Sequence, residues 1–171
     1  TETVRLLCAG KASAAMAAIS ILKKTAPELA IRFVNVSELT SLGIGDERHP
    51  LRLTDRQFEK YFTADKPIVF NFHGYPDVIK KLTWGHPAAS RFSIHGYMEE
   101  GTTTTPFDMH VRNQTSRYHL AIDCLVQGAK VNESIARKAP KLIKKFKEQL
   151  TKHQKYIVVH GKDMPEVEEW K

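Results

Sequence analysis

Along the first hundred residues, segments with the apolar pattern of β-strands alternate with segments that have the pattern of helices. Val4 to Ala9 and Pro67 to Phe72 are short, mostly apolar runs, and Ala30 to Val36 is rich in β-branched and aromatic residues. Runs of this length and composition predict β-strands. Phe92 to Tyr97 alternates in the manner of a fourth strand. The strands are separated by longer segments, so the pattern predicts a repeated strand–helix unit.

Three helices are predicted in the same region. The first is alanine-rich and runs from about Ser13 to Lys24. The second covers Thr54 to Phe62, because Thr54 with Gln57 makes a capping box. The third follows a Gly-Tyr-Pro turn and covers Pro76 to about Leu82. Ser37 to Leu53 predicts a long loop, since glycines and a proline interrupt it.

The last third of the chain has helical spacing. One helix is expected from Pro106, a second over Ser116 to Gly128, and a long third ending before Gly161, which Pro140 either starts or kinks. Strands alternating with helices indicate an α/β fold, here a three-layer α/β/α arrangement with a mostly parallel sheet and a helical C-terminal third. The 171 residues suffice for one domain over 1–171.

Cysteine content and hydropathy limit the setting of the chain. Cys8 and Cys124 lie inside apolar runs, which predicts buried thiols in a reducing compartment and no disulfide framework. No apolar stretch approaches the length of a membrane span, and the start lacks a secretory signal pattern. We expect a cytoplasmic protein that does not bind membranes. Because the chain opens in a strand pattern without a methionine, we also expect it to be part of a larger polypeptide.

The formal net charge of +7 is concentrated in one segment. Between residues 137 and 155 the only acid is Glu148, and an apolar stripe at helical spacing alternates with the basic residues. The stripe consists of Leu142, Ile143, Phe146 and Leu150, and the basic residues are Arg137, Lys138, Lys141, Lys144, Lys145, Lys147, Lys152 and Lys155. Because the basic residues occupy the face opposite the apolar stripe and no aromatic residues alternate with them on that face, this pattern favours a solvated helix face over a nucleic-acid site.

Four consecutive threonines precede the helix that starts at Pro106. Thr105 is placed to be its N-cap, Pro106 fits the first helical position, and Asp108 occupies the capping-box position. The unsatisfied N–H groups of the first turn form a cluster of donors. Further donors precede them, at Gly101, Thr102, Thr103 and Thr104. An anion or a neighbouring carboxylate could dock there.

His73 directly follows a buried strand, beside Gly74 and Tyr75, at the sheet edge where open α/β folds place ligands. Its imidazole could act as a general base or anion donor, or it could hydrogen-bond a neighbouring segment and hold the turn. His95 and Glu99 follow another strand end. These elements and the threonine run could therefore converge on one edge.

Three arginines, Arg91, Arg112 and Arg117, could bind a sugar phosphate or form structural ion pairs with Glu99, Glu100 or Asp123. The eight histidines show no metal-ligand spacing, so no metal site is expected. The phosphate-loop, dinucleotide-binding and nucleophile-elbow motifs are absent. So is the Gly-Asp-Gly plus asparagine signature with which thiamine-diphosphate enzymes hold Mg²⁺ and diphosphate.

Four stretches together resemble the C-terminal domain of the phosphoketolases. They are Phe72 to Pro76, Arg91 to Tyr97, the threonine run, and Gly161 to Trp170, and the resemblance covers nearly the whole chain. It implies a fold similar to the transketolase C-terminal domain. The full-length relatives are aldehyde-lyases that use thiamine diphosphate and Mg²⁺ to cleave xylulose 5-phosphate or fructose 6-phosphate with phosphate, giving acetyl phosphate and an aldose phosphate.

The resemblance also implies a division of labour. Upstream catalytic domains of the same polypeptide would hold the cofactor, and this domain, with no catalytic residue, would pack on them and on the dimer interface, and be inert alone. The expected inter-domain or anion-contacting residues are His73, Gly74, Tyr75, His95, Glu99, Gly101, Thr102, Thr103, Thr104, Thr105 and Asp108. Two alternatives remain: a phosphate- or nucleotide-binding regulatory module of the same enzyme, and a free-standing polyanion-binding protein.

Overall fold

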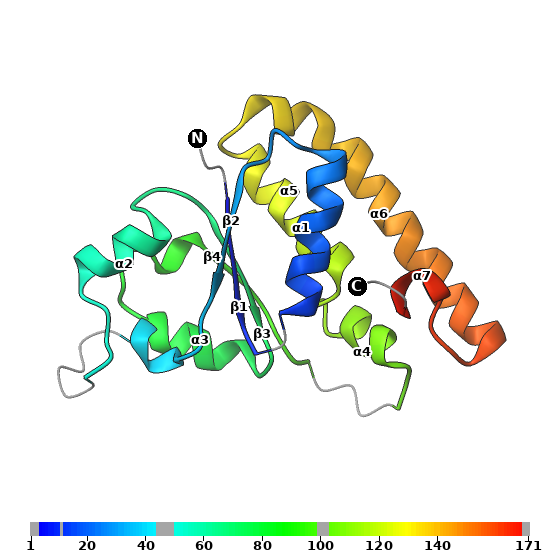
Figure 1. The fold of residues 1–171 in the computed structure, drawn as a ribbon, viewed down its shortest axis with the longest axis horizontal. Coiled ribbons are helices and arrows are strands. Elements are labelled where there is room, and N and C mark those ends of the chain that lie inside the picture. Colours follow the sequence, from blue (N-terminus) through cyan, green and yellow to red (C-terminus); the bar gives the residue numbers. More distant parts are fainter. Residues whose placement is uncertain (1–3, 11, 44–49, 99–102, 169–171) are drawn as a thin grey trace.

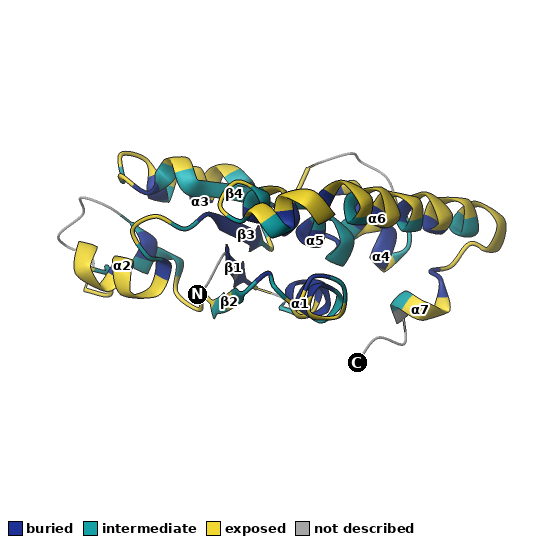
Figure 2. Cartoon of the chain, turned by 90° about the horizontal axis from the view of Figure 1, so that it is seen from above, coloured by how far each residue is buried: buried dark blue, intermediate teal, exposed yellow. Residues whose placement is uncertain are grey.

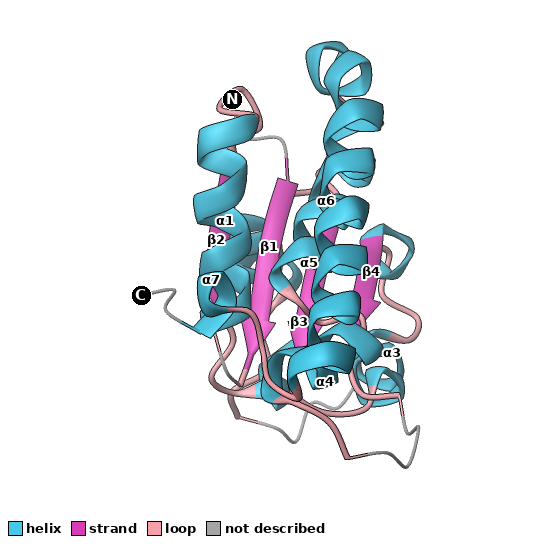
Figure 3. Ribbon diagram, turned by 90° about the vertical axis from the view of Figure 1, so that its right-hand side faces the viewer, coloured by secondary structure: helices cyan, strands magenta, loops and turns pink. Residues whose placement is uncertain are grey.

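The computed structural model describes residues 4–10, 12–43, 50–98 and 103–168. Within them, all strand pairs are parallel and join in the order β2-β1-β3-β4 (Figures 1 and 3). The strands are β1 (Val4–Ala9), β2 (Ile31–Asn35), β3 (Ile68–Phe72) and β4 (Phe92–His95). The expected parallel sheet is confirmed, and each strand falls within its predicted range.

Helices cover both faces of the sheet, which confirms the three-layer α/β/α arrangement (Figure 1). One face carries α1 and α5, with α6 packed on α5, and the other carries α2 and α3. The helices are α1 (Ser13–Thr25), α2 (Asp55–Phe62), α3 (Pro76–Thr83), α4 (Pro106–Arg112), α5 (Arg117–Ala129), α6 (Glu133–His160) and α7 (Pro165–Glu168). Two short 3₁₀ helices are η1 (Leu39–Leu42) and η2 (Ala89–Arg91).

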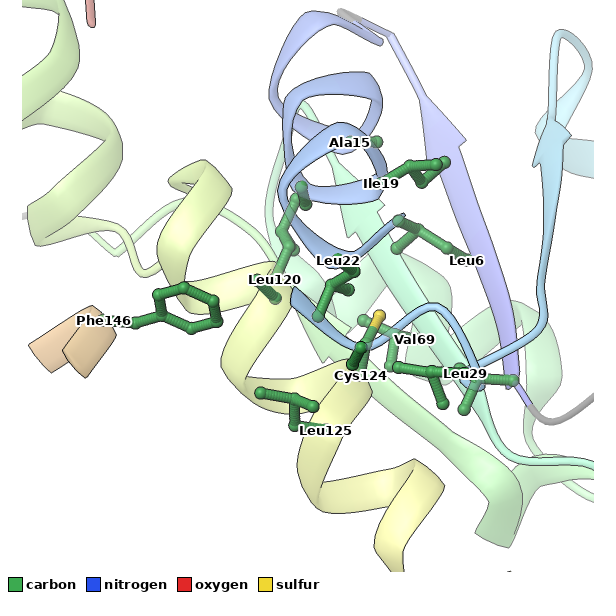
Figure 4. Close-up of a cluster of buried hydrophobic side chains, with 14 of the residues drawn as sticks. Leu6, Ala15, Ile19, Leu22, Leu29, Val69, Leu120, Cys124, Leu125 and Phe146 are labelled. Carbon is green, nitrogen blue, oxygen red and sulfur yellow. The ribbon is translucent and has the colours of Figure 1, made fainter. Parts of the chain in front are cut away.

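The larger core lies between the sheet and α1, α5 and α6 (Figure 4). Leu6 and Val69 point into it from the strands, Leu22 from α1, Leu120 from α5 and Phe146 from α6, all at most 2% exposed. Cys124 is also buried there, and burial, followed by the charge of neighbouring Asp123, raises the pKa of its thiol. Both cysteines are buried and free, as predicted.

A second core fills the opposite face of the sheet. Phe58 and Phe62 of α2 stack with ring centroids 4.5 Å apart and pack against Phe70 of β3, Ile79 of α3 and Leu42 of η1. Successive side chains of β3 enter the two cores in turn, because neighbouring side chains of a strand point to opposite faces of the sheet. The two central strands, β1 and β3, are therefore buried, as their dark blue colour in Figure 2 shows, whereas the edge strands β2 and β4 are less buried.

The structure corrects two sequence expectations. The predicted loop over 37–53 contains η1, whose first turn is capped by the side chain of Glu38, although residues 44–49 lie outside the described part. Pro140 does not start the last helix, because α6 begins at Glu133, capped by the side chain of Asn132, and contains Pro140 in its interior. The tail after Gly161 also includes α7.

Helix α6 places its basic residues outward, as its pattern predicts. Phe146 and Leu150 are buried against the domain, while the outer face is exposed along its length (Figure 2). Some of these cations pair within the chain: Lys138 with Glu28, and Lys152 Nζ with Glu166 Oε1 at 3.5 Å. Among the described helices, none combines the length and apolar character needed to cross a bilayer.

Candidate functional site at the sheet edge and the α4 N-terminus

The carboxyl ends of β1 and β3 lie side by side at the point where the strand order reverses. From β1 the sheet extends to β2 on one side and to β3 on the other, and such a switch point is where open α/β sheets bind ligands. The backbone N–H of His73 donates to Ala9 O at 3.0 Å. Gly10, with φ of +100°, lies so close that a Cβ there would be 2.6 Å from the Cβ of His73. Glycine is therefore needed beside His73.

Aromatic side chains surround His73 at this edge. Its Nε2 lies 3.2 Å from the hydroxyl of Tyr97, and the two ring centroids are 5.2 Å apart. Tyr75, the N-cap of α3, has its ring 6.3 Å from that of Tyr97. The backbone N–H of Tyr97 donates to Gly74 O at 2.8 Å. The segments after β3 and β4 are thus joined, and the interpretation that His73 hydrogen-bonds a neighbouring segment is confirmed.

A cavity of about 60 Å³ lies behind this aromatic group. Asn71 of β3 is 5% exposed, and its Oδ1 has no hydrogen-bond partner within the described residues. The residues lining the cavity are Asn71, Phe72, His73, Tyr97, Met109, His110, Asn113 and Thr115. Cys8 is a neighbour of Asn71. Burial raises the pKa of the Cys8 thiol, and a hydrogen bond from Asn71 lowers it by a smaller amount. Asn71 lines this polar cavity, and its unsatisfied buried acceptor calls for a hydrogen-bond donor, from a water molecule or from a partner.

The N-terminus of α4 is the second place where predicted residues gather. The hydroxyl of Thr105 accepts from the N–H of Asp108, which confirms the N-cap. Asp163, only 4% exposed, accepts the hydroxyl hydrogen of Thr105 and, through Oδ2 at 2.9 Å, the N–H of Phe107. The donors of this helix end are therefore met by a carboxylate of the same chain, 56 positions from Phe107.

Buried polar groups extend this arrangement. His153 of α6, 1% exposed, places its Nε2 3.2 Å from Asp163 Oδ1, and burial lowers the pKa of the imidazole while the charges of Asp163 and then Asp108 oppose that shift. The carboxylate of Asp108, buried at 2%, accepts from the Thr104 hydroxyl at 2.7 Å and from Arg112 Nε at 2.8 Å. These contacts tie α4, α6 and the segment before α7 together.

His95 is held elsewhere, against α5. Its Nε2 lies 2.8 Å from Asp123 Oδ2 and its Nδ1 lies 2.9 Å from Gln114 O. Both partners accept hydrogen bonds, so both contacts form together only when both ring nitrogens carry a hydrogen. Burial alone would raise the pKa of Asp123, but hydrogen bonds from His95, Ser93 and Gln127 outweigh it, and the pKa is lowered.

We expect Asp123→Asn to cost about 2 kcal/mol of unfolding free energy at pH 7, the range for a hydrogen-bonded charged group. Since the folded pKa of Asp123 is lowered, its stabilisation is present above the unfolded pKa and is lost as pH falls through the folded pKa. The difference in stability between the variant and the parent should therefore begin to shrink below about pH 4. Urea unfolding at pH 7 and pH 3 measures this. Asp77→Asn, at an exposed ion pair, is the control with no pH-dependent difference; a constant gap for Asp123→Asn would contradict the prediction.

The three arginines have structural partners. Arg91 donates to the backbone carbonyls of Phe62, Thr63 and Lys66, and so closes the end of α2. Arg117 donates to Val167 O at 3.0 Å and lies over the Phe107 ring.

For Arg112 the ion-pair interpretation is confirmed, with Asp108 as the carboxylate. That partner was not among the acids considered from the sequence, because helical i, i+4 spacing rather than strand ends brings it near.

The predicted site residues thus divide among three places. His73, Gly74 and Tyr75 lie at the sheet edge, Thr104, Thr105 and Asp108 at the α4 N-terminus, and His95 against α5. Thr103 is exposed, whereas Glu99, Gly101 and Thr102 lie outside the described residues. Any contact of these residues with a substrate, an effector or another domain stays a prediction.

Sequence reasoning missed several residues at these places. Asn71 carried a signal, as the one polar residue in an otherwise apolar strand, and so did Tyr97 after β4. Asp163 and His153 carried none, since only the fold brings them to α4. In the part of the chain that the structure describes, no group of three His, Cys, Asp or Glu residues is placed to hold a metal ion.

Comparison with known proteins shows which family the chain resembles along its length. The family model described as the XFP C-terminal domain matches residues 2–171. Probable phosphoketolases from Chlorobaculum tepidum, Nitrosomonas europaea and Bradyrhizobium diazoefficiens are 44%, 42% and 41% identical to this chain, over 98% of it. The match covers 21%, 21% and 20% of those proteins, so the chain spans about a fifth of their length. The chain belongs to the phosphoketolase C-terminal domain family.

Proposed function

We propose that this chain is the C-terminal domain of an enzyme that cleaves xylulose 5-phosphate, fructose 6-phosphate or both with inorganic phosphate, giving acetyl phosphate and an aldose phosphate. The observation that carries the proposal is the alignment of probable phosphoketolases over 98% of the chain at above 40% identity. The enzyme would be a cytoplasmic aldehyde-lyase of carbohydrate metabolism and a homodimer.

The domain itself is proposed to be a supporting unit without a catalytic residue. The residues at the sheet edge do not fit thiamine diphosphate, because a cavity of about 60 Å³ is small beside the roughly 300–1,000 Å³ of typical ligand pockets. Thiamine diphosphate and Mg²⁺ would be held by the other four-fifths of the polypeptide, where the cofactor stabilises a carbanion. This domain would pack on those catalytic domains and on the dimer interface.

The start of α4 does not favour the alternative that this domain is a phosphate- or nucleotide-binding regulatory module. It depended on free donors at the start of that helix, and the carboxylate of Asp163 already accepts from Thr105 and Phe107. A phosphate would have to displace a buried, hydrogen-bonded group, which costs free energy. We therefore favour the supporting role.

A chimera tests the proposed function. The segment of the Chlorobaculum tepidum relative that matches this chain is replaced by the 171 residues, which are 44% identical to it. We expect the chimera to form acetyl phosphate from fructose 6-phosphate or xylulose 5-phosphate at a kcat within about tenfold of the parent, a difference of about 1.4 kcal/mol in barrier. The measurement is acetyl phosphate release with saturating thiamine diphosphate, Mg²⁺ and phosphate.

Two controls complete the test. The relative lacking the segment should be inactive, and the 171-residue chain alone should neither turn over the sugar phosphates nor bind thiamine diphosphate. An inactive chimera that still binds the cofactor would contradict the proposed function, and turnover by the isolated chain would contradict the supporting role.

A further inference from the structure

Exposed apolar side chains gather around the mouth of the sheet-edge cavity. Tyr75 is 49% exposed, Tyr97 37%, Met98 47% and Met109 37%. They are contiguous, because the Tyr75 and Tyr97 rings lie 6.3 Å apart, Tyr97 and Met109 line the same cavity, and the N–H of Met98 donates to Asn113 of its wall. We call these four residues the edge surface. In Figure 3 the strand arrowheads point toward the end of the sheet where α3 and α4 lie.

The edge surface has the composition of an interface core. Tyrosine and methionine are enriched in the buried centres of protein interfaces, where lysine and glutamate are depleted. The two tyrosines also have neighbours before any partner arrives, since Tyr97 contacts His73 and the Tyr75 ring lies 6.3 Å from the Tyr97 ring. A surface that is already ordered loses less side-chain entropy on association.

The cavity also constrains the chemistry of a docked partner, because a polar group lines it. Asn71 Oδ1 is buried and lacks a partner among the described residues, and a buried acceptor left without a hydrogen bond is unfavourable. The volume of about 60 Å³ has room for the tip of a side chain. The occupant must therefore carry a hydrogen-bond donor on an apolar or flexible stem.

Other exposed apolar residues do not share this combination. Trp84 is 84% exposed at the end of α3, and Val158 is 85% and Val159 75% exposed near the end of α6. None of the three lines the cavity that Asn71 lines. Exposure alone therefore does not single out those positions.

We propose that the edge surface is where the catalytic portion of the phosphoketolase polypeptide docks, with a donor-bearing side chain of that portion inserted against Asn71 Oδ1. This rests on the proposed function, and it adds the face, the chemistry and the acceptor. The catalytic portion is the occupant because about four-fifths of the length of the relatives lies outside this chain. A second copy of this domain, or water alone, is the rival occupant.

The four methionines of the chain make a built-in test in the chimera described above. The side chain of Met16 on α1 is 45% exposed, a fraction similar to those of Met98 and Met109. Met164 is only 6% exposed. If the edge surface is docked, peroxide should oxidise Met98 and Met109 at least about fivefold more slowly than Met16, since sulfoxide formation follows exposure. Peptide mass spectrometry of this chain's own segments gives the four rates. Any smaller difference between Met16 and the edge methionines overturns the proposal.

A cross-link identifies the occupant. The photoreactive residue p-benzoylphenylalanine replaces Met109 in one chimera and Met16 in a matched control. Cross-linked peptides from the catalytic portion at position 109, and not at position 16, are the expected result. A cross-link at 109 to a second copy of this domain, or no protein cross-link there, overturns the proposal. Acetyl phosphate release is read separately, so an inactive chimera with a protected edge refutes the enzymatic function and keeps the docking face.

Discussion

Asp163→Ala should lower the free energy of unfolding by about 3–5 kcal/mol, because it removes two hydrogen bonds to a buried carboxylate, each worth about 1.5–3 kcal/mol. Asp163 is 4% exposed and satisfies both the hydroxyl of Thr105 and the N–H of Phe107. Its removal would leave a buried N–H at the start of α4 without an acceptor, and His153 without its neighbouring carboxylate. The change should therefore loosen α4 and α7 together.

Chemical denaturation followed by circular dichroism measures the effect, and amide exchange at Phe107 locates it. Glu166→Ala is the matched control, because it removes a nearby carboxylate from an exposed ion pair with Lys152 and should have almost no effect. If the two variants were equally stable, Asp163 would not be the group that holds the end of α4.

Phe146→Ala should cost about 3–5 kcal/mol, the range for truncating a buried phenylalanine. Phe146 is 2% exposed and is the large α6 side chain that enters the core shared with α1 and α5 (Figure 4). Its ring also lies 6.0 Å from that of Tyr118. The truncation leaves a cavity between α5 and α6, and the surrounding helices can close it only in part.

Val158→Ala on the same helix is the control, since Val158 is 85% exposed and its loss changes little packing. Thermal unfolding of both variants gives the comparison. A small effect of Phe146→Ala would mean that α6 is held mainly by its polar contacts, such as those of His153 and Lys138.

Local patterns in the sequence were enough to predict most of the architecture. The Thr54–Gln57 capping box is present with both of its hydrogen bonds, and Thr105 caps α4 with Pro106 in the first turn. Each of these signals acts within a few residues, so a single sequence contains the whole cause. The mostly apolar run over 4–9 likewise predicted a strand, and β1 lies between β2 and β3 in the sheet.

What could not be predicted depends on contacts between distant segments. Asp163 accepts a hydrogen bond from Thr105, 58 positions away in the sequence. No local sequence pattern near either residue predicts this contact. His95 followed a strand end like His73, yet it turns to Asp123 on α5 and not to the edge where His73 lies. Whether a strand-end side chain faces the edge or a covering helix is decided by packing, which one sequence pattern does not encode.

The position of β1 in the sheet bears on how the domain acquires its structure. β1 comes first in the chain but sits between β2 and β3, so its second neighbour exists only after Ile68–Phe72 has been synthesised. Parallel pairing over such separations closes long loops before it gains contacts, which slows folding. During synthesis on a ribosome, the N-terminal third would therefore expose the edge of β1 that later pairs with β3. A chaperone is suited to shield such an unpaired edge.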